Sequence, residues 1–376
     1  MRNCDSQRTL RCGEVIASFV LCLRTPPLAQ TPADRYNIIV ALPPQEQLAI
    51  VGSRGTASTV PKVSIAMISY NHAAFIAEAL DSIVSQETAF DIEVVIGDDC
   101  SKDNTREIIS RYAATYPFIK PVFHKVNVGM NANFVTVLMQ CRGDYVAVLE
   151  GDDYWTDPGK LQSQVSFLND HPECVLCHHR VSHVETSSGK VAQEFPPRDR
   201  RLPVCSPLLL THGNFIQTCT LMFRRDAMPV FDDEYFKLKL GDWPLCAKLG
   251  EKGLIGYIDR NMAVYRLHAG GAWSARNDEF RYEATLQMCR YLTNHFHGES
   301  RRAWIEAQLF YRYCLVTNAV CSPISRDFVR RVILLLRDTA TLDWRQVPLM
   351  TFRCARVVAR RLTGRKISLL GVMILG

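Results

Sequence analysis

Short apolar runs alternate with amphipathic segments along the chain from residue 63 onward. Apolar runs at 63–68, 92–96 and 145–149 have the length of buried strands, and 121–124 is a shorter one. Between them apolar residues recur at helical spacing, as Ile76, Leu80 and Ile83 do. This alternation predicts an α/β fold with a mostly parallel central sheet flanked by helices on both faces.

Polar residues and prolines predict where these helices begin. Asn71 is a candidate N-cap for the first helix, Asp103 and Asn104 for the second, and Asp157-Pro158 for a helix running to about residue 169. Further strands are predicted at 174–182, 215–224 and 254–258, with an irregular stretch at 183–213 and a helix near 242. Beyond about residue 278 the pattern is helical.

These boundaries predict three regions: a poorly ordered N-terminal extension and linker at 1–60, one α/β domain at 61–278, and a helical C-terminal extension at 279–376. The apolar run 15–23 follows three arginines and precedes Pro26-Pro27, so a cleaved signal peptide is the alternative for the first region. The 14 cysteines are scattered without close spacings, which favours reduced thiols and a cytoplasmic location.

The net charge of +6 is concentrated at one end of the chain. Seven basic residues and no acidic one lie from Arg345 onward, so residues 1–344 carry a net charge of −1. A nucleic-acid-binding surface is therefore disfavoured. The tail at 352–375 mixes arginines with apolar positions, which predicts peripheral contact with the inner face of the plasma membrane; a solvated or packed helix is the alternative.

Acidic residues cluster where two of the predicted strands end. Asp98-Asp99 follows one strand, and Glu150 with Asp152-Asp153 follows another, so both groups should meet at one edge of the sheet. Neighbouring carboxylates need a cation or strong hydrogen-bond donors to stay charged, and Mg²⁺ or Mn²⁺ held by one or two carboxylates usually completes its shell with water and phosphate oxygens. The pairs predict a nucleoside-phosphate site; acidic turn residues without a ligand are the alternative.

Three segments resemble family 2 glycosyltransferases of the GT-A fold: VSIAMISYN at 63–71, VVIGDDCSKDNT at 94–105 and GDYVAVLEGDDYWTDPGKLQSQVSFL at 143–168. The resemblance spans roughly residues 61–275. It implies transfer of a sugar from a nucleoside-diphosphate sugar to a hydroxyl acceptor with inversion, assisted by Mg²⁺ or Mn²⁺. The implied acceptor is a glycan or a lipid-linked glycan, in bacterial cell-surface glycan synthesis.

The resemblance also implies roles for single residues. Asp152 would hold the metal and diphosphate, with Glu150 standing where the family has aspartate and His268 as an extra metal ligand. The other residues expected to bind the nucleotide-sugar are Ser69, Tyr70, Asn71, Asp98, Asp99 and Arg266.

Asp242 matches the family's catalytic base, although Gly241 replaces the usual preceding acid and an ordinary helix cap is the alternative. Candidate acceptor contacts, each with a buried structural role as the alternative, are Asp153, Trp155, Gln217, Thr218 and Trp273.

Two other functions fit parts of the sequence. A sugar-phosphate nucleotidyltransferase also uses an α/β sheet and metal-bound phosphates, but no glycine-rich basic loop follows the first strand. A degenerate GT-A domain would bind nucleotide or glycan without turnover. The string Cys174-Val-Leu-Cys177-His178 resembles a metal or haem motif, yet it reads as a buried strand.

Overall fold

The computed structural model describes residues 60–318, 326–342 and 345. The predicted extension at 1–60, apart from Val60, and the basic tail at 352–375 lie outside the described residues. The strands are β1 (Val63–Ser69), β2 (Ile92–Asp98), β3 (Ile119–Phe123), β4 (Tyr145–Glu150), β5 (Tyr154–Trp155), β6 (Cys174–Glu185), β7 (Val191–Phe195), β8 (Val204–Cys205), β9 (Met222–Arg224) and β10 (Leu254–Leu267).

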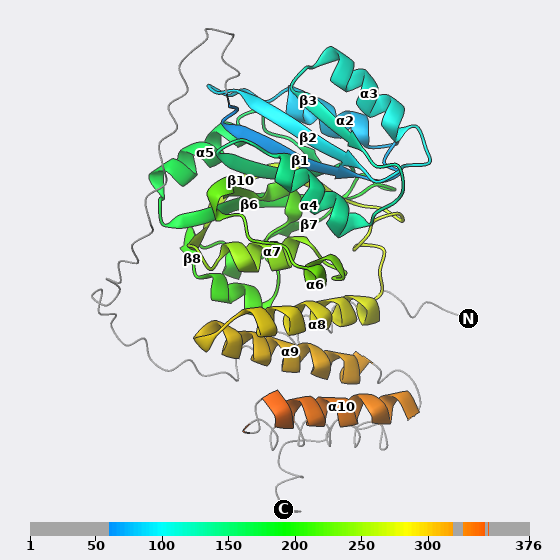
Figure 1. The fold of residues 1–376 in the computed structure, drawn as a ribbon, viewed down its shortest axis with the longest axis vertical. Coiled ribbons are helices and arrows are strands. Elements are labelled where there is room, and N and C mark those ends of the chain that lie inside the picture. The colour runs from blue at the N-terminus through cyan, green and yellow to red at the C-terminus, as the bar shows by residue number, and fades with distance from the viewer. Residues whose placement is uncertain (1–59, 319–325, 343–344, 346–376) are drawn as a thin grey trace, which may run out of the picture. The chain divides into compact units, whose positions relative to one another are not determined.

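The helices alternate with the first strands and then gather at the end of the described chain (Figure 1). They are α2 (Ile76–Val84), α3 (Thr105–Thr115), α4 (Met130–Gln140), α5 (Lys160–Asp170), α6 (Asp233–Phe236), α7 (Asp242–Leu249), α8 (Asp278–His295), α9 (Gly298–Asn318) and α10 (Arg326–Leu342), with short 3-10 helices η1 (Arg198–Arg200), η2 (Pro207–His212), η3 (Thr218–Thr220) and η4 (Arg225–Ala227).

The sheet has the order β3-β2-β1-β4-β9-β6-β10-β5, with β7 paired to β6 and β8 paired to β10. Strands β3, β2, β1 and β4 are parallel, as predicted. Beyond β4 the sheet is mixed, because β9 runs antiparallel to both of its neighbours, β4 and β6. The parallel prediction therefore holds for the half of the sheet that carries the acidic pairs.

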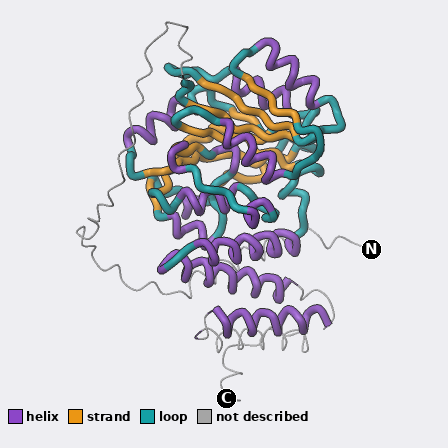
Figure 2. Tube along the Cα trace, in the orientation of Figure 1, coloured by secondary structure: helices purple, strands orange, loops and turns teal. Residues whose placement is uncertain are grey.

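Helices cover both faces of the sheet (Figure 2). One face packs against α4 and α7, and Met288 of α8 belongs to the same apolar cluster as Ala66 and Val137. The other face packs against α2, α3 and α5, where Ile65 and Leu80 belong to a second cluster. The two clusters follow the alternation of side chains along β1, as expected for a sheet buried on both faces.

Two helices begin later than predicted, α5 by only two residues. Asn71 does not cap α2, because it adopts a left-handed backbone conformation at φ 56° and α2 begins at Ile76. Helix α5 begins at Lys160 rather than beside Pro158, because the Asp157 carboxylate first closes a turn onto the Gly159 N–H at 2.9 Å. Strands β6 and β10 also extend well past their predicted ends.

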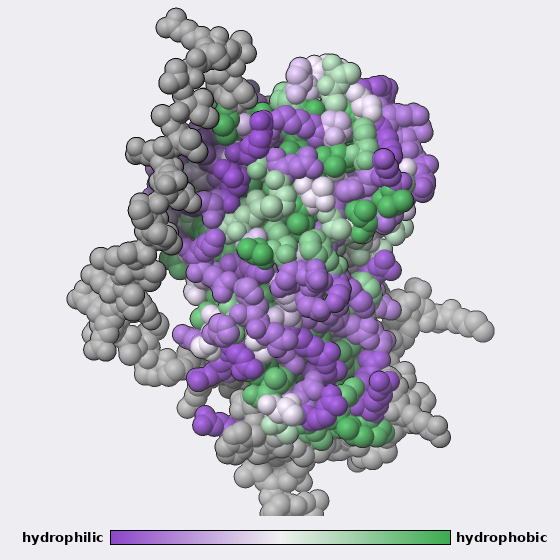
Figure 3. Space-filling model, viewed as in Figure 1, coloured by the Kyte–Doolittle hydropathy of each residue, from purple (hydrophilic) through white to green (hydrophobic). Residues whose placement is uncertain are grey.

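The C-terminal helices share the core of the α/β domain. Trp304 of α9 belongs to the same apolar cluster as Trp243 of α7, and the two indole rings lie 6.5 Å apart. Helix α10 packs on α9 through a smaller cluster that includes Leu309 and Leu335. On the face drawn in Figure 3 the surface over α8 and α9 is mainly hydrophilic. No helix among the described residues is long and apolar enough to cross a membrane.

Candidate active site

Strand β1 brings the two acidic groups to one edge of the sheet, as predicted. Its last residues pair in parallel register with both neighbours: Ser69 lies opposite Asp98 of β2, and Ile68 lies opposite Glu150 of β4. Because all three strands run in the same direction, their carboxyl ends open onto the same region. The acids that follow β2 and β4 therefore flank the end of β1.

Glu150 is the centre of a group of carboxyl groups. Burial raises the pKa of Glu150 well above its ordinary value, and the charges of Asp153, Asp152 and Asp242 raise it further. Its Oε2 has no hydrogen-bond partner among the described residues. Four acidic side chains thus meet in a region where ionisation of all of them is unfavourable without a compensating cation.

Asp152 differs from its neighbours because two histidines face it. Its Oδ2 lies 3.1 Å from Nε2 of His268 and 3.7 Å from Nε2 of His72. Although burial alone would raise the pKa of Asp152, the contact with His268 and the nearby His72 hold it below its ordinary value. Asp152 is consequently the member of the group that stays ionised most readily.

His72 is a site residue that the sequence analysis did not single out. Burial lowers its pKa, and its buried Nδ1 has no hydrogen-bond partner in the described part of the chain. Gly151 lies directly against it: a Cβ on Gly151 would come within 2.9 Å of Nδ1 of His72 and 3.1 Å of Oγ of Ser69. The only sequence signal for His72 is its place directly after Asn71, the last of the predicted nucleotide contacts at the end of the first strand.

Asp153 and Arg266 hold the end of β10 to the turn after β4. The backbone N–H of Arg266 donates to Oδ1 of Asp153 at 2.9 Å, and its guanidinium donates to the carbonyl of Asp152 at 2.7 Å. The guanidinium also pairs with Glu78 and lies 4.3 Å from the centroid of the Tyr154 ring. Asp153 is fully buried, which favours the structural alternative for this residue. The predicted contact of Arg266 with diphosphate stays a prediction.

The first acidic pair, Asp98 and Asp99, is held by hydrogen bonds from other segments of the described chain. Asp98 accepts hydrogen bonds from Ser101 and pairs with Arg106. Asp99 accepts from the backbone N–H groups of Val128 at 2.6 Å and Gly129 at 3.0 Å, which fixes the segment leading into α4. Both acids are buried. They therefore hold the surrounding loops in place, in addition to their predicted contact with a nucleotide.

The end of β1 presents the other predicted nucleotide contacts. The buried Ser69 hydroxyl has no hydrogen-bond partner among the described residues, and Tyr70 is exposed. The Asn71 side chain accepts from the N–H of Lys102 at 2.8 Å, which ties the β1 end to the loop after β2. The Ser69 hydroxyl is therefore available for a hydrogen bond to a polar ligand at this edge of the sheet.

Asp242 begins α7, and its charge adds to the raised pKa of Glu150. Its Oδ2 accepts from Nδ2 of Asn214 at 3.1 Å and from the hydroxyl of Thr218 at 3.3 Å. Burial raises the pKa of Asp242, while these donors and nearby backbone N–H groups oppose the rise. A carboxylate made more basic in this way suits a general base.

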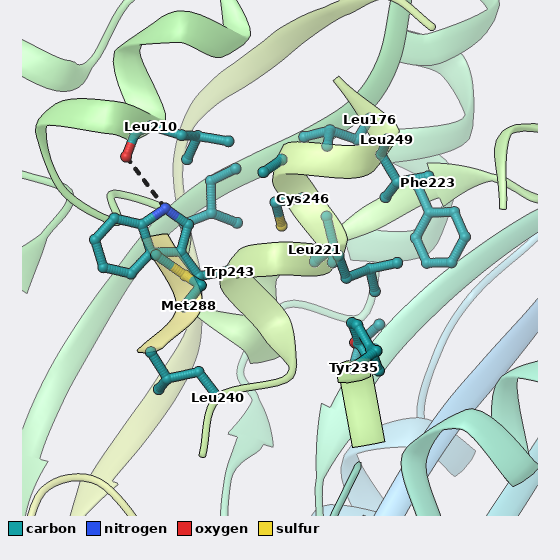
Figure 4. Close-up of a cluster of buried hydrophobic side chains, with 14 of the residues drawn as sticks. Leu176, Leu210, Leu221, Phe223, Tyr235, Leu240, Trp243, Cys246, Leu249 and Met288 are labelled. Atoms are coloured by element: carbon teal, nitrogen blue, oxygen red, sulfur yellow. Dashed lines mark hydrogen bonds between the residues drawn. The ribbon is translucent and has the colours of Figure 1, made fainter. Parts of the chain in front are cut away.

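The start of α7 is anchored in the core directly beside Asp242. Figure 4 shows Trp243 next to Leu240 and Met288, with its indole N–H donating to the carbonyl of Leu210 at 3.1 Å. Gly241 is required by its surroundings, since a Cβ there would come within 2.6 Å of Oδ1 of Asn131. The glycine that replaces the usual acid therefore allows α4 and α7 to approach closely.

The predicted acceptor contacts occupy different environments. Trp155 is buried, its indole N–H donates to the carbonyl of Cys219 at 2.9 Å, and the ammonium of the buried Lys160 lies 3.9 Å from its ring centroid. These contacts favour core packing for Trp155. Gln217 and Trp273 are partly buried, and Trp273 packs against the large apolar cluster. Their contact with an acceptor stays a prediction.

The donor set fits a metal held by few protein ligands. No group of three or more His, Cys, Asp or Glu side chains in the described ranges is arranged to hold a metal ion by itself. Asp152 nevertheless offers a partly exposed carboxylate, and the unpartnered Oε2 of Glu150 lies in the same group. This arrangement matches Mg²⁺ or Mn²⁺ sites in which one or two carboxylates bind and phosphate oxygens supply further ligands.

The prediction that residues Cys174–His178 form a buried strand is confirmed. All of it lies in β6, and both cysteines are buried free thiols. Burial raises the pKa of Cys174 to about 11 and that of Cys177 to about 12, so both are held as neutral thiols. His178 packs against the rings of Phe215 and Tyr257.

The helix-flanked, partly parallel sheet of this chain has the GT-A fold. The solved structure of S. aureus TarS, residues 1–349, shares this fold: the match covers 81% of this chain and 92% of that one, with a TM-score of 0.60 and 18% identity. The model of the family "Glycosyl transferase family 2" matches residues 64–231. The chain belongs to glycosyltransferase family 2.

Sequence relatives support this membership. The glycosyltransferase EpsE of Bacillus subtilis is 30% identical over 242 residues, 62% of this chain and 83% of that protein. The teichuronic acid biosynthesis glycosyltransferase TuaG of the same organism is 34% identical over 215 residues, 55% of this chain and 79% of that protein. An uncharacterized Mycobacterium tuberculosis protein is 44% identical over 225 residues, and the match spans 59% of this chain and 64% of that protein's length.

Proposed function

We propose that this protein transfers a sugar from a nucleoside-diphosphate sugar to a hydroxyl acceptor, with inversion at the anomeric carbon. The observation that carries the proposal is that Asp242 is joined to the strand that ends at Glu150: its Oδ2 accepts from the hydroxyl of Thr218 at the start of η3, and Leu221, just after η3, accepts from the backbone N–H of Val148 in β4 at 3.0 Å. The candidate base therefore lies close to the strand that carries Glu150. Such closeness is what a direct transfer between donor and acceptor needs.

The chain's own groups account for the proton and the bond changes. Asp242 takes the proton of the acceptor hydroxyl as that oxygen forms a bond to the anomeric carbon. The bond from the anomeric carbon to the diphosphate breaks at the same time, and its electron pair leaves with the diphosphate. Attack from the face opposite the leaving group inverts the anomeric centre. General-base assistance of this kind is worth roughly 10² to 10⁴ in rate.

Mg²⁺ or Mn²⁺ is the proposed cofactor, with Asp152 as its main ligand and Glu150 and His268 as further candidates. When bound, the ion supplies charge neutralisation for the leaving diphosphate. Ser69, Tyr70, Asn71, Asp98 and Asp99 are proposed to contact the nucleotide, and Arg266 the diphosphate. These assignments draw support from the common sheet edge on which the strand-end residues lie.

The proposed setting is bacterial cell-surface glycan synthesis in the cytoplasm, with a glycan or lipid-linked glycan as acceptor. The family relative TuaG is named for teichuronic acid biosynthesis, which supports a cell-surface polymer as the product class. Peripheral membrane contact through the tail at 352–375 is part of the proposal and concerns residues outside those described.

A donor screen tests this function. The full chain is incubated with UDP-, GDP- and dTDP-sugars and an octyl glycoside acceptor, with Mn²⁺, with Mg²⁺ or with EDTA, and nucleoside diphosphate and glycosylated product are measured. We expect one donor class to be turned over with a metal and not with EDTA, and Asp242→Asn to lower turnover by at least 10²-fold. NMR of the product's anomeric proton reports inversion.

Two results would replace the proposal. A sugar nucleotide that binds but is never hydrolysed or transferred would assign the chain to the binding-only alternative. Formation of a sugar nucleotide and pyrophosphate from a nucleoside triphosphate and a sugar phosphate would assign it to the nucleotidyltransferases. If Asp242→Asn turns over at the wild-type rate, the glycosyltransferase proposal stands, but Asp242 is not the base.

A further inference from the structure

We propose that Asn214 and Thr218 are positioning residues that hold the Asp242 carboxylate with its Oδ1 directed to the acceptor hydroxyl. The inference rests on the proposed function, since it assigns how the base of that reaction is oriented. Asn214 Nδ2 and the Thr218 hydroxyl both donate to the same atom, Oδ2, at 3.1 and 3.3 Å. An oxygen that accepts two hydrogen bonds has its lone pairs engaged, so the acceptor proton goes to Oδ1.

The orientation of the Asn214 amide is determined by a third residue. Its Oδ1 accepts the backbone N–H of Ile216 at 3.0 Å, so the amide oxygen points to Ile216 and the NH₂ group to Asp242. A hydrogen bond donated to Oδ2 stabilises the ionised carboxylate and disfavours a proton on that oxygen. Asn214 therefore favours the form of Asp242 that accepts a proton.

The segment that carries both donors is fixed to α7 independently of these hydrogen bonds. Phe215 and Ile216 are buried in the large apolar cluster that also holds Trp243. Trp243 in turn donates to the carbonyl of Leu210, in η2 just before this segment. The donors and the base are thus built into the same core.

The competing role for Thr218 is a direct hydrogen bond to the acceptor. The structure argues against it, because Thr218 is buried and its hydroxyl is directed at Asp242. The two roles predict different kinetics. A residue that orients the base acts on kcat, whereas a residue that only binds the acceptor acts on the acceptor KM.

The test compares three threonine variants in the full chain, with the donor that turns over in the screen and an octyl glycoside acceptor. Thr218→Val removes the hydroxyl and should lower kcat about 10-fold or more, with both KM values within about twofold of wild type. Thr218→Ser restores the hydroxyl and should recover most of kcat. Thr220→Val is the matched control from the same short helix, because its hydroxyl donates to the Gln217 carbonyl at 2.7 Å and not to Asp242.

Other outcomes overturn the inference. A raised acceptor KM with unchanged kcat in Thr218→Val would make Thr218 an acceptor contact, and a kcat equal to wild type would remove it from the site. Equal losses in Thr218→Val and Thr220→Val would reduce the effect to general destabilisation. If Thr218→Val does not fold, Asn214→Ala carries the same prediction through the other donor.

Asp242→Asn in the same assay separates this inference from the proposed function. If Asp242→Asn keeps wild-type kcat, the assignment of the base fails. If Asp242→Asn is inactive while Thr218→Val and Asn214→Ala keep wild-type kcat, only the positioning inference fails.

Discussion

The Nε2 atom of His268 lies 3.1 Å from Oδ2 of Asp152, which joins the end of β10 to the turn after β4 across 116 sequence positions. His268 is held in place by more than this contact, since its ring lies 4.8 Å from that of Phe75. The carboxylate assigned to the metal and diphosphate is therefore oriented by a residue from the far end of the domain. Histidines that orient a metal-binding carboxylate contribute strongly to metal affinity.

Removal of His268 should weaken metal-dependent donor binding. We expect His268→Ala to raise the dissociation constant for Mn²⁺ with nucleoside diphosphate by about 10- to 100-fold, measured by isothermal titration calorimetry. His295→Ala is the control, because His295 also pairs with a carboxylate, Glu251, but on α8. Equal affinity in His268→Ala and wild type would show that Asp152 needs no such support.

Gly151 should tolerate no side chain. A Cβ at Gly151 would lie 2.8 Å from Cδ1 of Ile76 and 2.9 Å from Nδ1 of His72, closer than real contacts allow. Gly151→Ala should lower the free energy of unfolding by about 1–3 kcal/mol in urea denaturation, together with a loss of donor binding. At Gly159 a Cβ meets only Oδ1 of Asp157 at 3.3 Å, so Gly159→Ala is the milder control. Wild-type stability in Gly151→Ala would contradict the packing described.

Glu93 should stabilise the fold at neutral pH and lose that effect in acid. Burial alone would raise its pKa, but hydrogen bonds from Lys120, Arg142 and Ser64 lower the pKa from 4.5 to about 2. The folded state binds the Glu93 proton less tightly than the unfolded state does. The contribution of Glu93 to the free energy of unfolding is therefore complete above about pH 4.5 and declines as the pH falls toward 2.

Glu93→Gln measures this contribution. Two of the partners of Glu93 are about half exposed, so the expected loss at pH 7 is on the order of 2 kcal/mol in urea denaturation. The difference from wild type should shrink between pH 4.5 and 3. The exposed Glu87→Gln serves as control. A difference that is independent of pH would assign the effect to packing instead of charge.

His178 should make the protein less stable in mild acid. Burial lowers its pKa from 6.5 to about 3, and neither ring nitrogen has a hydrogen-bond partner among the described residues. The unfolded state takes up the proton below about pH 6.5 while the folded state does not, so stability falls as the pH decreases from 6.5 toward 3.

His178→Phe should therefore flatten the dependence of Tm on pH between 5 and 7. The replacement keeps a ring against Phe215 and Tyr257 and removes the titrating group. The surface variant His171→Gln is the control, measured by the same thermal scans. An unchanged slope of Tm against pH in His178→Phe would show that other groups cause the acid sensitivity.

Local pattern was sufficient for the part of the site built from adjacent strands. β1, β2 and β4 are short and apolar, and β1 pairs in parallel with both of the others. The acids at the ends of β2 and β4 therefore lie at one edge of the sheet, which follows from the strand pattern alone. Helix starts were predicted less well. Asn71 and Asp157 have capping chemistry, but each is used in a turn or loop contact before its helix begins.

Long-range contacts were not predictable in the same way. Nothing in the sequence indicates that the Arg266 guanidinium contacts the carbonyl of Asp152, or that Trp155 is enclosed with Lys160. The mixed half of the sheet was also missed, because β9 is only three residues long and its direction is determined by its partners β4 and β6. Periodicity reports burial and says little about which strand becomes the neighbour.

Residues close together in the chain are enough to predict the α/β class, the acidic strand ends and the family motifs. The hydrogen bonds of Asn214 and Thr218 to one oxygen of Asp242 arise only on folding. They depend on residues from separate segments, which the packing of α7 and η2 through Trp243 and Leu210 brings together. Side-chain chemistry is encoded locally, whereas the orientation of the base depends on the core.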